Sequence, residues 1–147
     1  RGPEVDRYLR AAGLDPARGS YAWCAAFLCW LFAESAARLG VDNPMPREAG
    51  VMNLWRRLDA DGRLLLPAAA AQADPGQVTP GMVFFLRFSG GLGHAGLVRA
   101  VDGPRLVTIE GNTTNRTGSR EGVGVFRRTQ RTIAAVNLGF ADPACSG

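Results

Sequence analysis

Residues 22–39 constrain the fold most, because they read as one buried helix. The run AWCAAFLCWLFAESAARL is apolar almost all round through its first three turns, and helices with that pattern are buried. Gly40 follows it, at the position where many helices end in a left-handed residue. The chain has 147 residues, of which 46% are hydrophobic, enough for one ordinary domain with a core around this helix.

Two shorter helices are expected beside this segment, at residues 3–12 and 48–59. Residues 64–81 contain several Pro and Gly and are expected to form a loop. After Pro80-Gly81 the pattern changes to short segments rich in β-branched and aromatic residues, separated by turn residues. These segments are residues 82–88, 94–101, 105–111, 122–128 and 133–140. Helices followed by antiparallel strands predict an α+β fold with a sheet of five or six strands and no domain boundary.

The charge of the chain is +4, and every basic residue is Arg. A mildly basic surface suits a polyanion, but a solvated surface is the favoured interpretation. Several arginines gather in the last third of the chain, without the zinc spacing or interleaved aromatic residues of a nucleic-acid module, and we interpret them as a solvated face. They are Arg116, Arg120, Arg127, Arg128 and Arg131. No apolar run is long enough to span a membrane, so membrane insertion is not expected.

The three cysteines are too few for a disulfide scaffold. Cys29 and Cys145 could pair in an oxidising compartment, which would leave Cys24 alone, but we do not expect that pairing. Cys24 stands at the start of the buried helix, where unpaired N–H groups and the helix dipole favour a thiolate and so activate it as a nucleophile. The alternative is a small buried hydrophobe. Cys29, five residues further along the same helix, fits that alternative better.

His94 is the only histidine, and it opens a strand that returns through a short hairpin. Residues 102–104 predict a three-residue turn. That turn places His94 opposite Asn112, with Glu110 as its diagonal neighbour on the same face. With Cys24 brought by the buried helix, these are the parts of a Cys–His–acid triad. The alternative is that Glu110 and Asn112 are ordinary polar residues near a strand end.

Three stretches resemble the CHAP amidohydrolase/peptidases, a family of the papain-like superfamily that also holds the Nlp-type wall peptidases. YAWCAAFLCWLF is similar to the nucleophile helix of that family, and TPGMVFFL is similar to its first core strand, where Met82 replaces a usual Asp. GHAGLVRAV, followed by LVTIEGNT, is similar to the strand that carries the histidine and to the strand that returns beside it. The resemblance implies a papain-like fold and a single catalytic domain over residues 1–147.

The activity implied by this resemblance is hydrolysis of an amide bond in peptidoglycan peptides, through covalent acyl transfer, by a lysin or an antibacterial effector toxin. The resemblance maps the nucleophile to Cys24, the base to His94 and the orienting acid to Glu110, with Asn112 nearby. The backbone N–H of Cys24 is the expected oxyanion donor.

Tyr21 and Trp23, just before the nucleophile, either line the cleft or pack under the start of the helix. Some CHAP domains carry an acidic calcium loop upstream of the cysteine. This sequence has no such Asp-rich loop, so we expect neither a metal nor another cofactor.

Peptidoglycan is the expected partner, with an immunity or inhibitor protein as a further partner if the protein is a toxin. We expect a monomer that acts at the bacterial cell wall, whether secreted, periplasmic or delivered into a target cell, and that binds no nucleic acid. Two alternatives stay open. One keeps the fold but acts on proteins as a cysteine peptidase or transfers the acyl group, and the other is a non-catalytic module that binds the wall.

Overall fold

The computed structural model describes residues 2–19, 21–113 and 124–147 and, at residues 112 and 113, the backbone only. In this part of the chain four helices pack with one antiparallel sheet of six strands, which confirms the α+β prediction. The helices are α1 (Pro3–Ala11), α2 (Cys24–Leu39), α3 (Val51–Ala60) and α4 (Ala68–Ala73). The strands are β1 (Arg63–Pro67), β2 (Val83–Arg87), β3 (Gly93–Asp102), β4 (Arg105–Thr113), β5 (Gly124–Thr132) and β6 (Gly139–Ser146).

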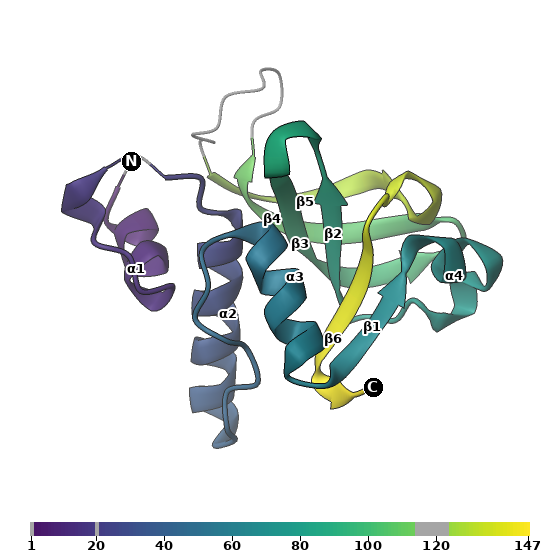
Figure 1. Ribbon diagram of the computed structural model, residues 1–147, viewed down its shortest axis with the longest axis horizontal. Helices are drawn as coiled ribbons and strands as arrows, with labels where there is room; N and C mark the ends of the chain where they lie inside the picture. Colours follow the sequence, from purple (N-terminus) through teal and green to yellow (C-terminus); the bar gives the residue numbers. More distant parts are fainter. Residues whose placement is uncertain (1, 20, 114–123) are drawn as a thin grey trace.

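The N-terminal helices lie on one side of the sheet (Figure 1). Helix α2 packs against β3 and β4, and α1 covers the side of α2 that faces away from the strands. Tyr8 of α1 joins the two helices, with its ring centroid 5.3 Å from that of Phe27 and 5.0 Å from that of Trp30. Gly40 ends α2 in the left-handed conformation, with φ of 67°, as its place in the sequence predicts.

The sheet has the strand order β1-β6-β2-β3-β4-β5 and carries a core on each face. Successive residues of a strand point to opposite faces. On β2, Val83 and Phe85 accordingly join the core around α2, whereas Phe84 and Leu86 join a second core on the other face. Polar side chains of β3 and β4 that point toward the second core are therefore enclosed by protein.

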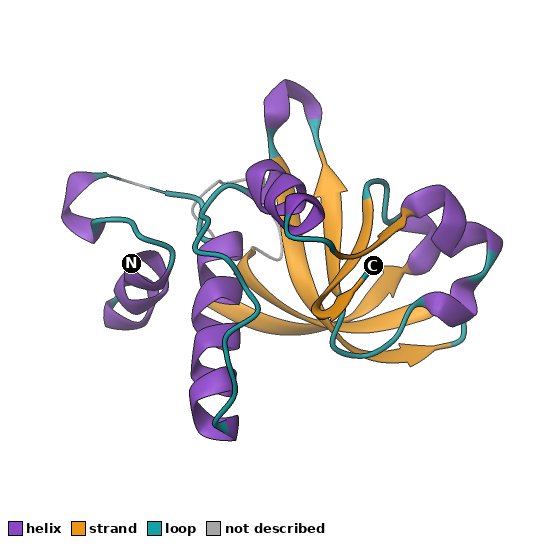
Figure 2. Ribbon diagram, turned by 60° about the horizontal axis from the view of Figure 1, so that its bottom comes forward, coloured by secondary structure: helices purple, strands orange, loops and turns teal. Residues whose placement is uncertain are grey.

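Residues 64–81 do not form the predicted loop. Most of this segment is ordered as strand β1 and the short helix α4, which lies beside β1 and β6 at the end of the molecule away from α1 (Figure 2). Leu65 of β1 pairs with Ala141 of β6, near the C-terminus. Such pairing with a distant strand outweighs the local preference of a segment for a loop, and it leaves no trace in the segment itself.

The segment at residues 133–140 is also not the single strand that was predicted. Residues Ile133–Ala135 form a 3-10 turn, in which the Thr132 hydroxyl accepts a hydrogen bond from the Ala135 N–H, and β6 begins only at Gly139. A Cβ at Gly139 would lie 2.5 Å from the Leu66 carbonyl oxygen, so a close approach of two chains requires glycine at this point.

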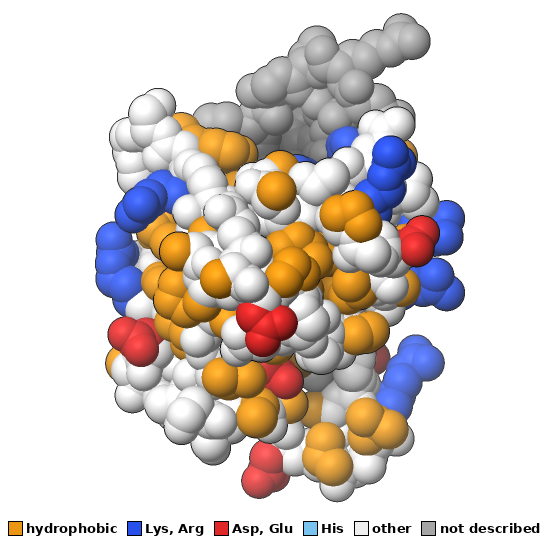
Figure 3. All heavy atoms as spheres, turned by 90° about the vertical axis from the view of Figure 1, so that its right-hand side faces the viewer, with side chains coloured by type: hydrophobic (Ala, Val, Ile, Leu, Met, Phe, Trp, Pro, Cys, Tyr) orange, Lys and Arg blue, Asp and Glu red, His pale blue; other side chains and the backbone are white. Residues whose placement is uncertain are grey.

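The described helices include none that is both long and apolar enough to cross a lipid bilayer. On the face drawn in Figure 3, the Arg side chains lie toward the edges, with apolar groups, uncharged groups and carboxylates between them. The described residues of that face therefore do not form the continuous basic patch that would favour a polyanion.

Candidate active site

Cys24 is the first residue of α2, as predicted. The side chain of the N-cap residue Trp23 makes no hydrogen bond with the start of the helix, so it does not satisfy any of the first N–H groups. These groups and the helix dipole put partial positive charge beside the Cys24 sulfur, where an oxyanion bound to it would be stabilised. Cys24 is buried but contributes to the lining of a surface groove.

The β3–β4 hairpin reaches the predicted register by a different route. Asp102 pairs with Arg105, so the turn has two residues and not three. A β-bulge in β3 then moves the register by one residue, and Leu97 pairs with Ile109 as a three-residue turn would have it. The two departures cancel, and the residues at the start of β3 and near the end of β4 share the faces that were predicted.

His94 and Glu110 meet between these strands. The His94 Nε2 atom donates a hydrogen bond of 2.8 Å to Glu110 Oε1. The His94 side chain is 12% exposed, whereas that of Glu110 is completely buried. Gly96 makes room for this contact, because a Cβ there would lie 2.8 Å from Glu110 Cγ and 2.5 Å from the Phe84 ring.

The Glu110 carboxylate accepts three more hydrogen bonds besides the one from His94. Arg131 binds both carboxylate oxygens along one edge of its guanidinium, with Nε 2.6 Å from Oε2 and Nη2 2.6 Å from Oε1. The Thr108 hydroxyl donates to Oε2 at 2.6 Å. The Arg131 guanidinium carbon also lies 4.9 Å from the centroid of the Phe84 ring, a cation–π contact. A buried carboxylate needs such donors, because burial without partners is strongly unfavourable.

These contacts move the pKa values of both ionisable partners. Burial raises the pKa of Glu110, but the hydrogen bonds from Arg131, His94 and Thr108 outweigh it and lower that pKa from 4.5 to about 2. Burial lowers the pKa of His94, but the hydrogen bonds with Cys24 and Glu110 outweigh it and raise that pKa from 6.5 to about 9. The His94–Cys24 contact brings the predicted nucleophile and the predicted base together. Because Nε2 is taken by Glu110, Nδ1 is the ring nitrogen left to exchange a proton with the sulfur.

The interpretation of the C-terminal arginines as a solvated face is wrong for two of them. Arg131 binds Glu110, and the Arg128 Nε atom lies 3.7 Å from Glu110 Oε1. Both side chains are 26% exposed. Arg127 is exposed, in agreement with the prediction, and Arg116 and Arg120 lie outside the described residues. The reason is the position of β5, which lies beside β4 and turns two arginines toward the buried acid.

Sequence reasoning missed Arg131 because it had no means of setting the register between β4 and β5. That register shifts twice, and it brings Arg128 opposite Thr108. One signal was nevertheless present. Glu110 stands in the apolar run LVTIEG of a strand expected to be buried, and a buried carboxylate calls for a cation nearby.

A groove of about 580 Å³ opens at the start of α2. Its lining is formed by Leu14, Tyr21, Ala22, Cys24, Ala49, Gly50, Val51, Gly91, Leu92 and Gly93. None of these residues carries a charged side chain. The two aromatic residues before the nucleophile thus differ, since Tyr21 lines the groove while Trp23 is buried, with its ring centroid 5.6 Å from that of Tyr8. This arrangement favours the packing role for Trp23, which the sequence had left open.

Gly111, between Glu110 and Asn112, lets α2 lie close to β4. A Cβ at this position would be 2.8 Å from Phe27 Cβ and 2.9 Å from the Trp23 ring. The glycine of the Glu-Gly-Asn run therefore serves the helix–strand packing that brings the nucleophile near its base.

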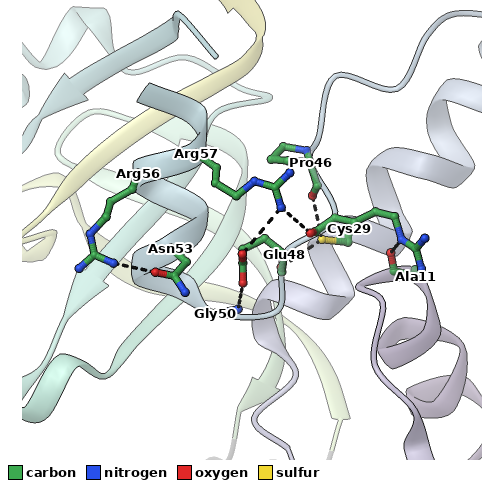
Figure 4. A network of polar contacts seen from close by, with 9 residues as sticks. Ala11, Cys29, Pro46, Glu48, Gly50, Asn53, Arg56 and Arg57 are labelled. Atoms are coloured by element: carbon green, nitrogen blue, oxygen red, sulfur yellow. Dashed lines mark hydrogen bonds and ion pairs between the residues drawn. The ribbon is translucent and has the colours of Figure 1, made fainter. Parts of the chain in front are cut away.

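Cys29 has a structural environment, as expected. Its thiol donates to the carbonyl oxygens of Pro46 and Glu48 at 3.4 and 3.3 Å (Figure 4), and burial raises its pKa. The three cysteines are all free, and Cys145 is exposed, so Cys29 and Cys145 are not paired.

The same network anchors residues 46–50 (Figure 4), and residues 49–51 line one side of the groove. Arg47 donates to the Ala11 carbonyl at the end of α1 at 3.3 Å, and Arg57 of α3 donates to the Arg47 carbonyl at 2.7 Å. The Glu48 carboxylate accepts a hydrogen bond of 3.0 Å from the Gly50 N–H. These contacts connect α1 and α3 through residues 47–50, which precede α3, and Gly50 lines the same groove as Cys24.

Asn112 belongs to β4, but its side chain lies outside the described residues, so its role stays a prediction. Within residues 2–19, 21–113 and 124–147 no group of three or more His, Cys, Asp or Glu side chains could hold a metal ion.

Comparison with protein-family models gives one match, to the CHAP domain, over residues 16–112. The match covers about two thirds of the chain and includes Cys24, His94 and Glu110, but it ends before β5 and Arg131. No curated protein matches the chain.

Proposed function

The chain belongs to the CHAP domain family, whose members are generally amidases or peptidases, often of peptidoglycan, and from this premise we propose that it cleaves an amide bond in cell-wall peptides with Cys24 as its nucleophile. One observation carries the proposal. The thiol at the start of α2 contacts the only imidazole of the chain, and that imidazole donates to a buried carboxylate. This is the arrangement of a nucleophile, a base and an orienting acid.

In the first half of the reaction, the Cys24 sulfur attacks the carbonyl carbon of the scissile amide as its proton is held by His94. A carbon–sulfur bond forms, and the carbonyl oxygen becomes an oxyanion. The N–H groups at the start of α2 face this position and stabilise the charge. Glu110 keeps Nε2 of His94 as a donor, so that Nδ1 exchanges the proton with sulfur and substrate.

In the second half, the tetrahedral intermediate collapses and the carbon–nitrogen bond breaks. His94 gives its proton to the leaving amine. Water, deprotonated by the now neutral His94, attacks the thioester, releases the carboxylate and restores the thiol. The products are one new amine and one new carboxylate for each bond cut.

The lining of the groove narrows the class of substrate. Glycine and alanine make up half of it, and its other members are apolar apart from Tyr21 and Cys24. A peptide backbone approaches closely where side chains are small. Since the described residues of the lining carry no charged side chain to pair with a carboxylate or an amine, the residues on either side of the scissile bond are expected to be small and uncharged, such as alanine or glycine.

The test is digestion of purified peptidoglycan, followed by mass spectrometry of the soluble products. The proposal expects new pairs of amino and carboxyl ends, which also identify the bond. Cys24→Ala should lower the rate about 10⁴-fold or more while the far-UV circular dichroism spectrum is retained, because nucleophile and base act as a unit. Cys29→Ser is the matched control, since it replaces a thiol of the same helix but keeps a donor for the Pro46 and Glu48 carbonyls, and it should keep its activity.

The outcomes separate the alternatives. Transfer of the acyl group to an added amine, without a free carboxylate, would identify an acyltransferase. Cleavage of unfolded protein but not of peptidoglycan would identify a protein-directed peptidase. Wall binding that is unchanged in Cys24→Ala, with no product from either protein, would leave a binding module. As part of the same proposal, the protein acts at the bacterial cell wall as a monomer, and a toxin of this kind would meet an immunity or inhibitor protein.

A further inference from the structure

The completely buried carboxylate of Glu110 is bound along both oxygens by one guanidinium from the neighbouring strand β5. We infer that Arg131 is a positioning residue of the triad: its guanidinium holds the Glu110 carboxylate ionised and in the plane that presents Oε1 to His94. Only the test of this inference by kcat/KM rests on the proposed function. Arg131 lies outside the region that matches the family model.

The geometry limits the orientation of the carboxylate. Nε and Nη2 of Arg131 are each 2.6 Å from a different oxygen of Glu110, which is the two-pronged arrangement that fixes the plane of both groups. Oε1 then has one further short contact, the bond of 2.8 Å with His94, and Oε2 has the bond of 2.6 Å with Thr108. Rotation of the carboxylate would break all of these contacts at once.

Arg131 is itself held in place by aromatic packing. Its guanidinium lies over the ring of Phe84, which is completely buried in the second core. The same ring lies beside His94, with centroids 6.0 Å apart. Phe84 therefore contacts both the base and the residue that positions its acid, so the three groups form one packed unit.

Several charged groups face Glu110, and they come from two strands. His94 approaches from β3, and Arg131 and Arg128 approach from β5, the latter at 3.7 Å from Oε1. Cys24 on α2 bears on Glu110 only through His94. Arg131 lies closer to the carboxylate than Arg128 does. Among the described residues, Arg131 alone makes two hydrogen bonds with it.

The experiment compares Arg131→Gln, Arg131→Lys and the control Arg127→Gln. The control removes the same type of side chain from an exposed position of the same strand. Arg131→Gln should lower kcat/KM on peptidoglycan about 10- to 100-fold, as expected for the loss of hydrogen bonds to a charged group. It should also move the acid limb of the pH profile upward by about one to three pH units, because Glu110 then takes up a proton more readily. Arg131→Lys should keep most of the acid limb and recover only part of the rate, because an ammonium cannot bind both oxygens in one plane.

A second readout does not need activity. As the only imidazole of the chain, His94 gives one assignable ring signal in a ¹H–¹³C NMR spectrum. Its shift should show protonation of Glu110 at higher pH in Arg131→Gln than in the parent protein, and Arg127→Gln should match the parent. If peptidoglycan is not cleaved at all, the proposed function fails, whereas this titration still decides the role of Arg131.

A double variant tests whether Arg131 acts through Glu110. In a Glu110→Gln background, the further change Arg131→Gln should have almost no additional effect on kcat/KM. Additive effects in the double variant, an acid limb that stays in place in Arg131→Gln, or full recovery of the rate in Arg131→Lys would each overturn the inference. A loss of activity that merely follows a fall in thermal stability, with both pH titrations unchanged, would mean that Arg131 is only structural.

Discussion

Replacement of Glu110 by glutamine should remove a contribution to stability that depends on pH. The carboxylate and the amide have nearly the same shape, so the variant isolates the charge. The folded protein lowers the pKa of Glu110 from 4.5 to about 2, and each pH unit of separation corresponds to about 1.4 kcal/mol. The ionised Glu110 therefore adds about 3 kcal/mol to the free energy of unfolding above its ordinary pKa.

The sign follows from which state binds the proton more tightly. Below the ordinary pKa of Glu110, its carboxylate is protonated in the unfolded chain but still ionised in the folded protein. The free energy of unfolding therefore falls as the pH falls from the unfolded pKa toward the folded pKa. Between about pH 5 and pH 2 the parent protein should lose about 3 kcal/mol relative to Glu110→Gln, whose amide does not titrate. In the parent protein His94 stays protonated throughout this window, because its pKa is raised to about 9.

Urea unfolding, followed by the fluorescence of the three tryptophans at a series of pH values, measures this difference. Glu34→Gln is the control, because it makes the same chemical change at an exposed position of α2 and reports what the loss of a surface carboxylate does. A gap between the parent protein and Glu110→Gln that does not change with pH would refute the reasoning. Glu110 would then not be an anion that the fold stabilises.

Two further perturbations test other parts of the site. On the alkaline side, kcat/KM should fall with an apparent pKa of about 9. His94 must carry a proton for the leaving amine, and it loses that proton as the pH rises through this value. Rates on peptidoglycan fragments between about pH 7 and pH 10 measure this apparent pKa. Gly111→Ala should lower the free energy of unfolding by about 1–3 kcal/mol, because the added Cβ meets Phe27 and Trp23 at 2.8 and 2.9 Å. Urea unfolding measures this loss, and an unchanged midpoint would show that the packing around Gly111 is loose.

The parts of the fold that could be predicted are those set by local patterns. The apolar run of α2, the Pro at the start of α1 and the alternation of β3 and β4 each carry their own signal. Strand β1 has no such signal, since it is ordered by its pairing with β6 at the other end of the chain. The same holds for the start of β6, where a 3-10 turn capped by Thr132 interrupts a segment of strand-like composition.

Part of the candidate site was predicted correctly only because two departures from the predicted hairpin cancel. The placement of Cys24 follows from one helix start, which is a local property. The shared face of His94 and Glu110 was derived from a turn of the wrong length, and a bulge that no pattern indicates restored the register. Arg131 could not be placed, because its contact depends on the register of a strand that follows residues 114–123.

The buried position of Glu110 explains why a site built from three residues needs a fourth. A carboxyl group with no exposed surface would ordinarily be neutral, and a neutral acid would stabilise an imidazolium far less. A fold that encloses the acid of its triad must therefore supply a cation from another element. Here the cation comes from β5, so a chain that ended at residue 112 would contain Cys24, His94 and Glu110 but would leave the carboxylate without the guanidinium that keeps it charged. The proposed catalytic unit thus extends past Glu110, the last residue of the predicted triad, and includes the strand that neutralises the acid.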